Sequence, residues 1–99
     1  MDMFRSEGAA MLVKAILALK TEDECRAFLE DLMTGKEIQD CGQRLMVAKL
    51  LSEQMVYSRI AEATGASSAT ISRVNRCYTY GTGGYRIILD RLCGEEKAQ

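Results

Sequence analysis

Residues 57–76, YSRIAEATGASSATISRVNR, decide the fold. Two short helices joined by a tight turn must cross closely, which requires residues of particular size at fixed places. Ala61 lies midway along the first helix, and Gly65 follows where the helix end needs the left-handed conformation that glycine adopts at little cost. The apolar wedge between the helices consists of Ile60, Ile71 and Val74. A structural αα-hairpin could share part of this set, whereas the full set predicts a DNA-binding helix-turn-helix.

The second helix of this motif has a surface suited to the major groove of DNA. Small polar residues at its start let it lie deep in the groove, and arginine can bind guanine bidentately or pair with a phosphate. Either Ser67 or Ser68 can cap this helix, whose first N–H groups add a phosphate site. Arg59, on the preceding helix, is expected to touch the DNA backbone. The predicted DNA-binding residues are Arg59, Ser67, Ser68, Ala69, Thr70, Ser72, Arg73 and Arg76.

Positive charge gathers on the same part of the chain. The 99 residues carry a net charge of −1. Residues 1–55 contain seven basic and ten acidic side chains, whereas residues 56–93 contain five arginines against Glu62 and Asp90. A basic segment within an acidic protein can still hold a polyanion. Chance unevenness of a solvated surface is the alternative explanation for the charge taken alone.

The rest of the chain is expected to be helical, so the fold class is all-α. The sequence lacks proline and is rich in residues that favour helices. Thr21–Glu24 and Thr34–Glu37 fit capping boxes, in which a Thr hydroxyl and a Glu carboxylate satisfy free N–H groups at a helix start. The helices outside the motif are expected at about Phe4–Leu19, Thr21–Met33 and Thr34–Ser52, with a last one around residues 85–92. Their apolar sides include Cys25, Phe28, Leu29 and Leu32 in the second, and Ile38, Cys41, Leu45, Ala48 and Leu51 in the third.

Chain length predicts one domain, residues 1–99, that ends in a frayed polar tail over residues 94–99. A domain this short buries a modest fraction of its surface, yet 47% of its residues are apolar. We therefore expect a homodimer that shares its core. The cluster Gly81–Gly84 is expected to be a connector, since no strand or Gly-Lys-Ser/Thr ending marks a phosphate loop. The tyrosines around it are expected to pack on the dimer core: Tyr78, Tyr80 and Tyr85.

The four cysteines, Cys25, Cys41, Cys77 and Cys93, lie far apart, and the chain has no histidine. These spacings do not suggest a metal site and exclude the usual zinc-finger pattern. Buried free thiols in a reducing cytoplasm are expected. No apolar run approaches membrane-spanning length, and the first residues do not form a signal peptide. No Cys or Ser has an evident base beside it, so we do not expect an enzyme.

Residues 64–74, TGASSATISRV, closely resemble the recognition segment of the Trp repressor superfamily, above all its YerC/YecD-type members. Residues 43–51, QRLMVAKLL, and residues 21–28, TEDECRAF, fit the same group. The resemblance extends over about Met11 to Leu92. It implies six helices, an intertwined homodimer and transcriptional regulation through two major-groove contacts. Because a two-fold dimer presents its recognition helices about one DNA turn apart, the target should be a rough palindrome of double-stranded DNA.

The same resemblance raises the question of an effector. In the Trp repressor, tryptophan lies beside the recognition helix with its indole ring between two arginines; Arg73 matches one, and Arg44 is the candidate for the other. Val74 stands where the repressor has glycine, and Cys77 where it has a serine that contacts the ligand. Added bulk and a lost hydroxyl argue against an unaltered tryptophan pocket. The resemblance implies no cofactor and no established effector, and any effector pocket should border Arg44, Arg73 and Cys77.

Two functions follow from these observations. The first is a sequence-specific transcriptional regulator, a repressor that binds a palindromic operator as a homodimer. The alternative is an adaptor that keeps the fold, binds another protein through its acidic first half and does not bind DNA. The two differ at Arg73 and Arg76, because an adaptor tolerates their replacement by alanine. A DNA-binding protein should lose about 1–3 kcal/mol of binding free energy per lost base contact.

Overall fold

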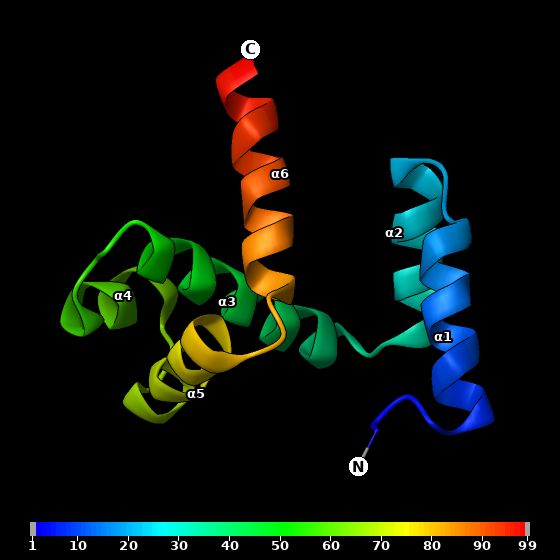
Figure 1. The fold of residues 1–99 in the computed structure, drawn as a ribbon, viewed down its shortest axis with the longest axis horizontal. Coiled ribbons are helices and arrows are strands. Elements are labelled where there is room, and N and C mark those ends of the chain that lie inside the picture. Colours follow the sequence, from blue (N-terminus) through cyan, green and yellow to red (C-terminus); the bar gives the residue numbers. More distant parts are fainter. Residues whose placement is uncertain (1, 99) are drawn as a thin grey trace. The chain divides into compact units, whose positions relative to one another are not determined.

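The chain is helical throughout the residues that the structure describes. The structure is a computed structural model and describes the backbone of residues 2–98 and the side chains of residues 2–94. Its six helices are α1 (Glu7–Ala18), α2 (Glu22–Leu32), α3 (Gly35–Ser52), α4 (Tyr57–Thr64), α5 (Ser68–Tyr80) and α6 (Gly84–Ala98) (Figure 1). The predicted all-α fold of six helices is confirmed. The chain divides into two compact units, residues 1–38 and residues 39–99, and the boundary falls within α3.

In the first unit, α1 begins three residues later than the predicted start at Phe4. Ser6 has an extended backbone conformation, and its hydroxyl accepts the Ala9 N–H at 3.1 Å. A capping side chain at this place fixes the start of the helix at Glu7, whose carboxylate lies at the positive end of the helix dipole. The apolar periodicity predicted an end at about Leu19, which agrees with the observed end of α1 at Ala18.

Both predicted capping boxes mark a helix start, but they close differently. Thr34 and Glu37 form the reciprocal pair, in which the Glu37 N–H donates to the Thr hydroxyl at 3.1 Å and the Glu37 carboxylate accepts the Thr34 N–H at 2.9 Å. The Thr21 hydroxyl likewise accepts the Glu24 N–H at 3.1 Å. The Glu24 carboxylate, however, accepts the N–H of Lys20, one residue before the cap, at 2.9 Å. Each device still provides acceptors for two backbone N–H groups, one in the first turn of the helix and one at or just before the cap.

The first unit contains no buried side chain on α1 or α2. Cys25, Phe28 and Leu29 were predicted to face inward and are half-buried, whereas Leu32 is exposed. The inward position predicted for Leu32 is therefore wrong in the single chain. Its residue type and spacing fit a core position, but this chain does not supply enough surface to cover it.

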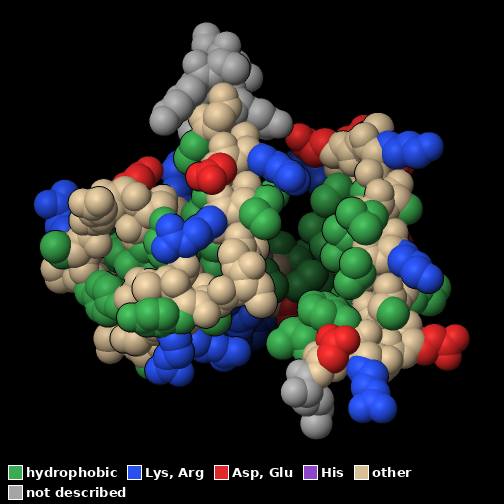
Figure 2. Space-filling view, in the orientation of Figure 1, with side chains coloured by type: hydrophobic (Ala, Val, Ile, Leu, Met, Phe, Trp, Pro, Cys, Tyr) green, Lys and Arg blue, Asp and Glu red, His purple; other side chains and the backbone are tan. Residues whose placement is uncertain are grey.

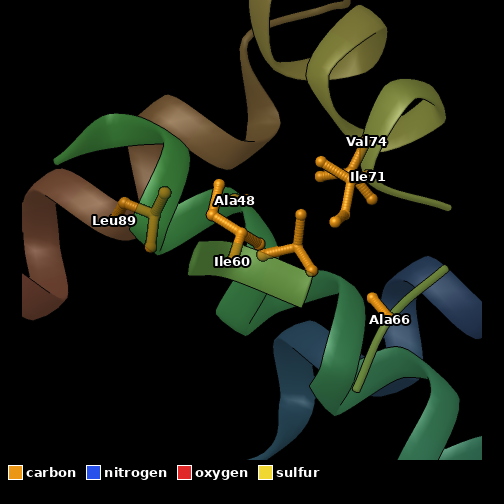
Figure 3. Close-up of a cluster of buried hydrophobic side chains, with 7 residues drawn as sticks. Ala48, Ile60, Ala66, Ile71, Val74 and Leu89 are labelled. Carbon is orange, nitrogen blue, oxygen red and sulfur yellow. The ribbon is translucent and has the colours of Figure 1, made fainter. Parts of the chain in front are cut away.

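The second unit has its own hydrophobic core, formed by α3, α4, α5, α6 and the turn between α4 and α5. Figure 3 shows the side chains converging from these elements, with Ile60 of α4 beside Ala48 of α3 and with Ile71 and Val74 of α5. Partly buried apolar side chains surround this cluster, Ala61 among them. The predicted wedge between the two helices of the motif is thus confirmed, and it is joined by Val47, Ala48, Ala66 and Leu89.

The connection from α5 to α6 differs from the prediction in length. Helix α5 continues four residues past Arg76, to Tyr80, and α6 continues to Ala98 where the sequence predicted a frayed tail from Gly94. Gly83, in the short connector, has a φ of 92° that favours glycine. Arg86 ties the two helices together, since its Nε donates to the Tyr78 carbonyl at 3.2 Å and its guanidinium lies 4.3 Å from the centre of the Tyr78 ring. This contact fixes where α6 leaves α5.

The four cysteines are free thiols, but the prediction that they are buried is wrong. Cys41 and Cys77 are exposed, and Cys25 and Cys93 are half-buried. Cysteine side chains are buried in most proteins, but Cys41 and Cys77 occupy helix faces that the single chain leaves open. Tyr78 and Tyr85 pack against the core of the second unit, whereas Tyr80 is 84% exposed. None of the helices in the described residues is both long and apolar enough to cross a membrane.

Candidate nucleic-acid interface

The turn between α4 and α5 is held by backbone conformation and by side-chain hydrogen bonds. Gly65 ends α4 in the left-handed region, with φ 72° and ψ 6°, and its N–H donates to the Ala61 carbonyl at 2.8 Å. The Thr64 hydroxyl donates to the Ile60 carbonyl at 2.7 Å and accepts the Ala66 N–H at 3.2 Å. The conformation predicted for Gly65 is therefore confirmed. These hydrogen bonds hold the turn and favour one geometry between the helices.

Gln43 connects this turn to the rest of the second unit. Its side-chain Nε2, on α3, donates to the Thr64 carbonyl across 21 residues of sequence at 3.1 Å, and the bond is partly buried. A hydrogen bond from a distant helix fixes the turn relative to α3 as well as within itself. The roles of Gln43 and of the buried Ala66 were not predicted from the sequence. No local pattern reveals either, because each acts through a neighbour that is distant in sequence or through the packing of the turn.

The start of α5 is capped by Ser67, one of the two serines that the sequence left open. Ser67 has an extended conformation, and its hydroxyl accepts the Thr70 N–H at 3.1 Å. The same hydroxyl donates to Thr70 Oγ1 at 3.1 Å. Ser68 is thereby the first residue of the helix, and its side chain is exposed. Thr70 is half-buried, so it is the least accessible of the predicted DNA-binding residues on α5.

Opposite faces of α5 have opposite characters. Ile71 and Val74 are buried against the core, which holds the helix by its apolar side. The opposite face is exposed and carries Ser67, Ser68, Ala69, Ser72, Arg73 and Arg76. Arg59, on α4, is exposed too, and none of these arginines forms an ion pair among the described residues. Figure 2 shows Lys and Arg side chains gathered on the side of the second unit that α5 forms.

The three residues of the predicted effector pocket lie around one cavity. It has a volume of about 210 Å³ and is lined by Arg44, Thr70, Arg73, Val74, Cys77 and Tyr85. Arg44 comes from α3, Tyr85 from α6, and the other four from α5. Burial raises the pKa of the Tyr85 phenol and the charge of Cys77 raises it further, while Arg44 acts in the opposite direction. The Tyr85 hydroxyl is therefore a neutral hydrogen-bond donor at neutral pH, and the sequence gave no signal for its place here.

The chain resembles known proteins along most of its length. Residues 7–93 match the family described as Trp repressor protein. The uncharacterized protein YerC of Bacillus subtilis is 47% identical over 91 residues, which cover 92% of this chain and 88% of YerC.

Two crystal structures share the fold. A TrpR-like protein from Eubacterium eligens is 48% identical, with a TM-score of 0.85, over 90% of this chain and 92% of that protein. A protein from Staphylococcus aureus, described as a candidate Trp repressor, is 41% identical, with a TM-score of 0.85, over 93% of this chain and 95% of that protein. The predicted resemblance is confirmed, and the chain belongs to the Trp repressor family.

Proposed function

We propose that this protein is a cytoplasmic, sequence-specific transcriptional repressor that binds a palindromic operator in double-stranded DNA as a homodimer. The observation that carries the proposal is α5, whose apolar side is buried and whose opposite side presents small polar residues and two arginines. A helix held in this way can enter the major groove without moving relative to its support. Membership of the Trp repressor family supports the same function.

Each predicted residue has a distinct role in this proposal. Arg73 and Arg76 provide long cationic side chains for base edges or phosphates. Ser68, Ala69 and Ser72 are small, so the start of α5 can come close to the base pairs. Arg59 lies on α4, the helix that crosses the DNA backbone in this kind of motif. Ser67 and Thr70 act through the cap, because each uses its hydroxyl to fix the start of α5.

The homodimer is supported by apolar surface that one chain leaves uncovered. Leu17 of α1 is 79% exposed, and Ile87, Ile88 and Leu92 form an exposed apolar set on α6. Large apolar side chains left exposed on a helix of each unit favour an interface with another protein. A second copy would cover these side chains and place two copies of α5 for two half-sites. The operator would then be a rough palindrome.

Selection from a random duplex library with the purified full-length protein tests this function. We expect enrichment of a palindromic motif whose binding weakens steeply with salt, because cationic contacts to phosphate release counterions. The variant Arg73→Ala/Arg76→Ala should lose about 1–3 kcal/mol of binding free energy for each base contact removed. A matched control is Arg26→Ala/Arg91→Ala, which removes the same charge from exposed positions on α2 and α6.

The control variant should keep the enriched motif. If both double variants weaken binding equally, total charge rather than α5 governs the interaction. If the folded, dimeric wild type enriches no sequence, the adaptor function is favoured, and capture of protein partners becomes the next experiment.

A further inference from the structure

The guanidinium group of Arg86 joins α6 to the end of α5 in three ways. Its Nε donates a hydrogen bond to the Tyr78 carbonyl at 3.2 Å, and its central carbon lies 4.3 Å from the centre of the Tyr78 ring. The Tyr78 carbonyl belongs to the last turn of α5, where carbonyls have no partner within the helix. A cation at this place also faces the negative end of the helix dipole. A hydrogen bond, a cation–π contact and the dipole thus act together on one side chain.

The connector between α5 and α6 does not fix the angle between the two helices by itself. It consists of Gly81, Thr82 and Gly83, and α6 begins at Gly84. Glycine adopts a wide range of backbone conformations, so a segment rich in glycine constrains its direction weakly. Gly83 uses this freedom, with a φ of 92°. The direction of α6 therefore depends on the contacts that its side chains make with the rest of the second unit.

These contacts are of two kinds. Leu89 is buried in the core, and Tyr85 packs against the core from the first turn of α6. Apolar packing holds α6 against the unit, but the hydrophobic effect has no preferred direction. The hydrogen bond from Arg86 is directional, because N–H···O bonds weaken steeply away from a linear geometry. Arg86 therefore defines the angle between α5 and α6 more closely than the apolar contacts do.

A small change in this angle has a large effect in the proposed homodimer. Figure 1 shows α6 projecting from the rest of the second unit, and its exposed apolar set, Ile87, Ile88 and Leu92, is part of the surface that supports the dimer. Leu92 lies about 12 Å along the helix axis from Gly84. A tilt of about 10° moves Leu92 by about 2 Å relative to α5, and two-fold symmetry doubles this to about 4 Å between the two copies of α5. One base pair rises about 3.4 Å, so this shift is enough to change the preferred distance between half-sites.

We propose that Arg86 is a positioning residue that sets the spacing between the two half-sites of the operator. It acts through Tyr78, by fixing the angle between the candidate recognition helix α5 and helix α6, and not by contact with DNA. The inference rests on the proposed function, because a spacing exists only for a homodimer on a palindromic operator. Loss of the Arg86 side chain should leave the sequence of each half-site unchanged and relax the distance between the two.

The first test measures the angle between the helices without DNA. Amide residual dipolar couplings are recorded by NMR for the weakly aligned full-length protein, as wild type, Arg86→Met and Tyr78→Leu. In the wild type, the couplings of α5 and α6 should fit one alignment tensor, because the two helices form one rigid body. In both variants we expect either two different tensors or a changed angle between the helices. Two tensors in the wild type, or the wild-type angle in the variants, would overturn the proposal.

The second test measures Kd for duplexes that carry the selected half-sites with the spacer lengthened or shortened by one base pair. The wild type should bind the selected spacing at least about tenfold more tightly than either altered spacing, as for a misplaced base contact. In Arg86→Met this ratio should fall about fivefold, the effect of losing one hydrogen bond that holds the angle. Binding to a duplex with a single half-site should equal that of Arg91→Met, which removes the same charge from an exposed position of α6.

The control variants separate the angle from charge and from stability. Arg91→Met and Tyr78→Phe should keep the wild-type ratio, because the first leaves the contact intact and the second keeps the aromatic ring. Arg86→Lys keeps the charge and a donor, so it should restore part of the spacing preference. An unchanged ratio in Arg86→Met, or an equal loss of affinity at every spacing, would refute the positioning role. If the wild type enriches no sequence, the proposed function and the spacing role fail together, whereas the dipolar couplings still decide whether Arg86 fixes the angle.

Discussion

All seven buried apolar side chains of the described chain lie in the second unit, whereas α1 and α2 of the first unit contain none. Helix α1 is the most apolar of the six helices and still buries no side chain, so composition does not explain the difference. The second unit folds four helices around a shared cluster. On α1, by contrast, Leu17 is 79% exposed and Ile16 51% exposed.

This difference separates two uses of an amphipathic helix. The periodicity of a sequence shows that a helix has an apolar face, but it does not show which chain covers that face. In the second unit the same chain covers the apolar sides of α4 and α5 that carry Ile60, Ile71 and Val74, and this core supports the candidate DNA-binding surface, although α6 keeps exposed apolar side chains. In the first unit we infer that the cover comes from a second copy. Stability and binding should therefore respond differently to changes in the two units.

The largest effect is expected from Ile71→Ala. Ile71 is fully buried between α5 and its neighbours, and loss of its side chain leaves a cavity in the core. The free energy of unfolding should fall by about 2–5 kcal/mol, measured by urea denaturation at fixed protein concentration. A loss below about 0.5 kcal/mol, the value for an exposed position, would mean that α5 is not held by this core.

The next largest effect is expected in the first unit, on the apolar face of α1. Ile16→Glu places a charge on α1 opposite its polar face, at a side chain that is half exposed in the single chain. If a second copy covers this face, the variant should lose at least about 2 kcal/mol of dimer stability, because burial of an isoleucine side chain contributes about this much. Sedimentation equilibrium over a range of concentrations measures the shift toward monomer.

Lys14→Gln is the matched control for this substitution. It changes the net charge of the chain by the same amount at an exposed position of α1. We expect its effect to stay within about 0.5 kcal/mol. If Ile16→Glu is equally harmless, the first unit does not form a dimer interface. The inference that a second copy covers the apolar face of α1 is then wrong.

The features that the sequence predicted well are those that depend on near neighbours. Thr34 with Glu37, and Gly65 with Ala61, act within four residues, so their pattern is visible in one line of sequence. The features that were missed depend on distant contacts. Gln43 reaches Thr64 from another helix, and Ala66 of the turn packs in a core that four helices share. Periodicity alone cannot reveal which distant residues meet.

The residues around the cavity also divide into those that could be grouped before the structure and one that could not. Arg44, Arg73 and Cys77 were grouped through the family resemblance, which carries information about the fold that local patterns lack. Tyr85 was assigned to the dimer core in general and not to this wall, because the connector between α5 and α6 determines its place. The exposure of Cys77 was mistaken for burial, since the preference of a residue type says little about an individual position.

The smallest effect concerns the turn that fixes the candidate DNA-binding helix. Gly65→Ala adds a Cβ that meets no atom within 4 Å, so the expected loss comes from the backbone alone. At a φ of +72° this strain costs about 1–2 kcal/mol for a residue with a side chain. Gly42→Ala makes the same chemical change inside α3, where the new Cβ also meets nothing, and it should stabilise the protein by about 1 kcal/mol. Urea denaturation of both variants measures the sign of each change in the free energy of unfolding. If Gly42→Ala lowers this free energy as much as Gly65→Ala does, added bulk rather than the left-handed backbone governs the turn.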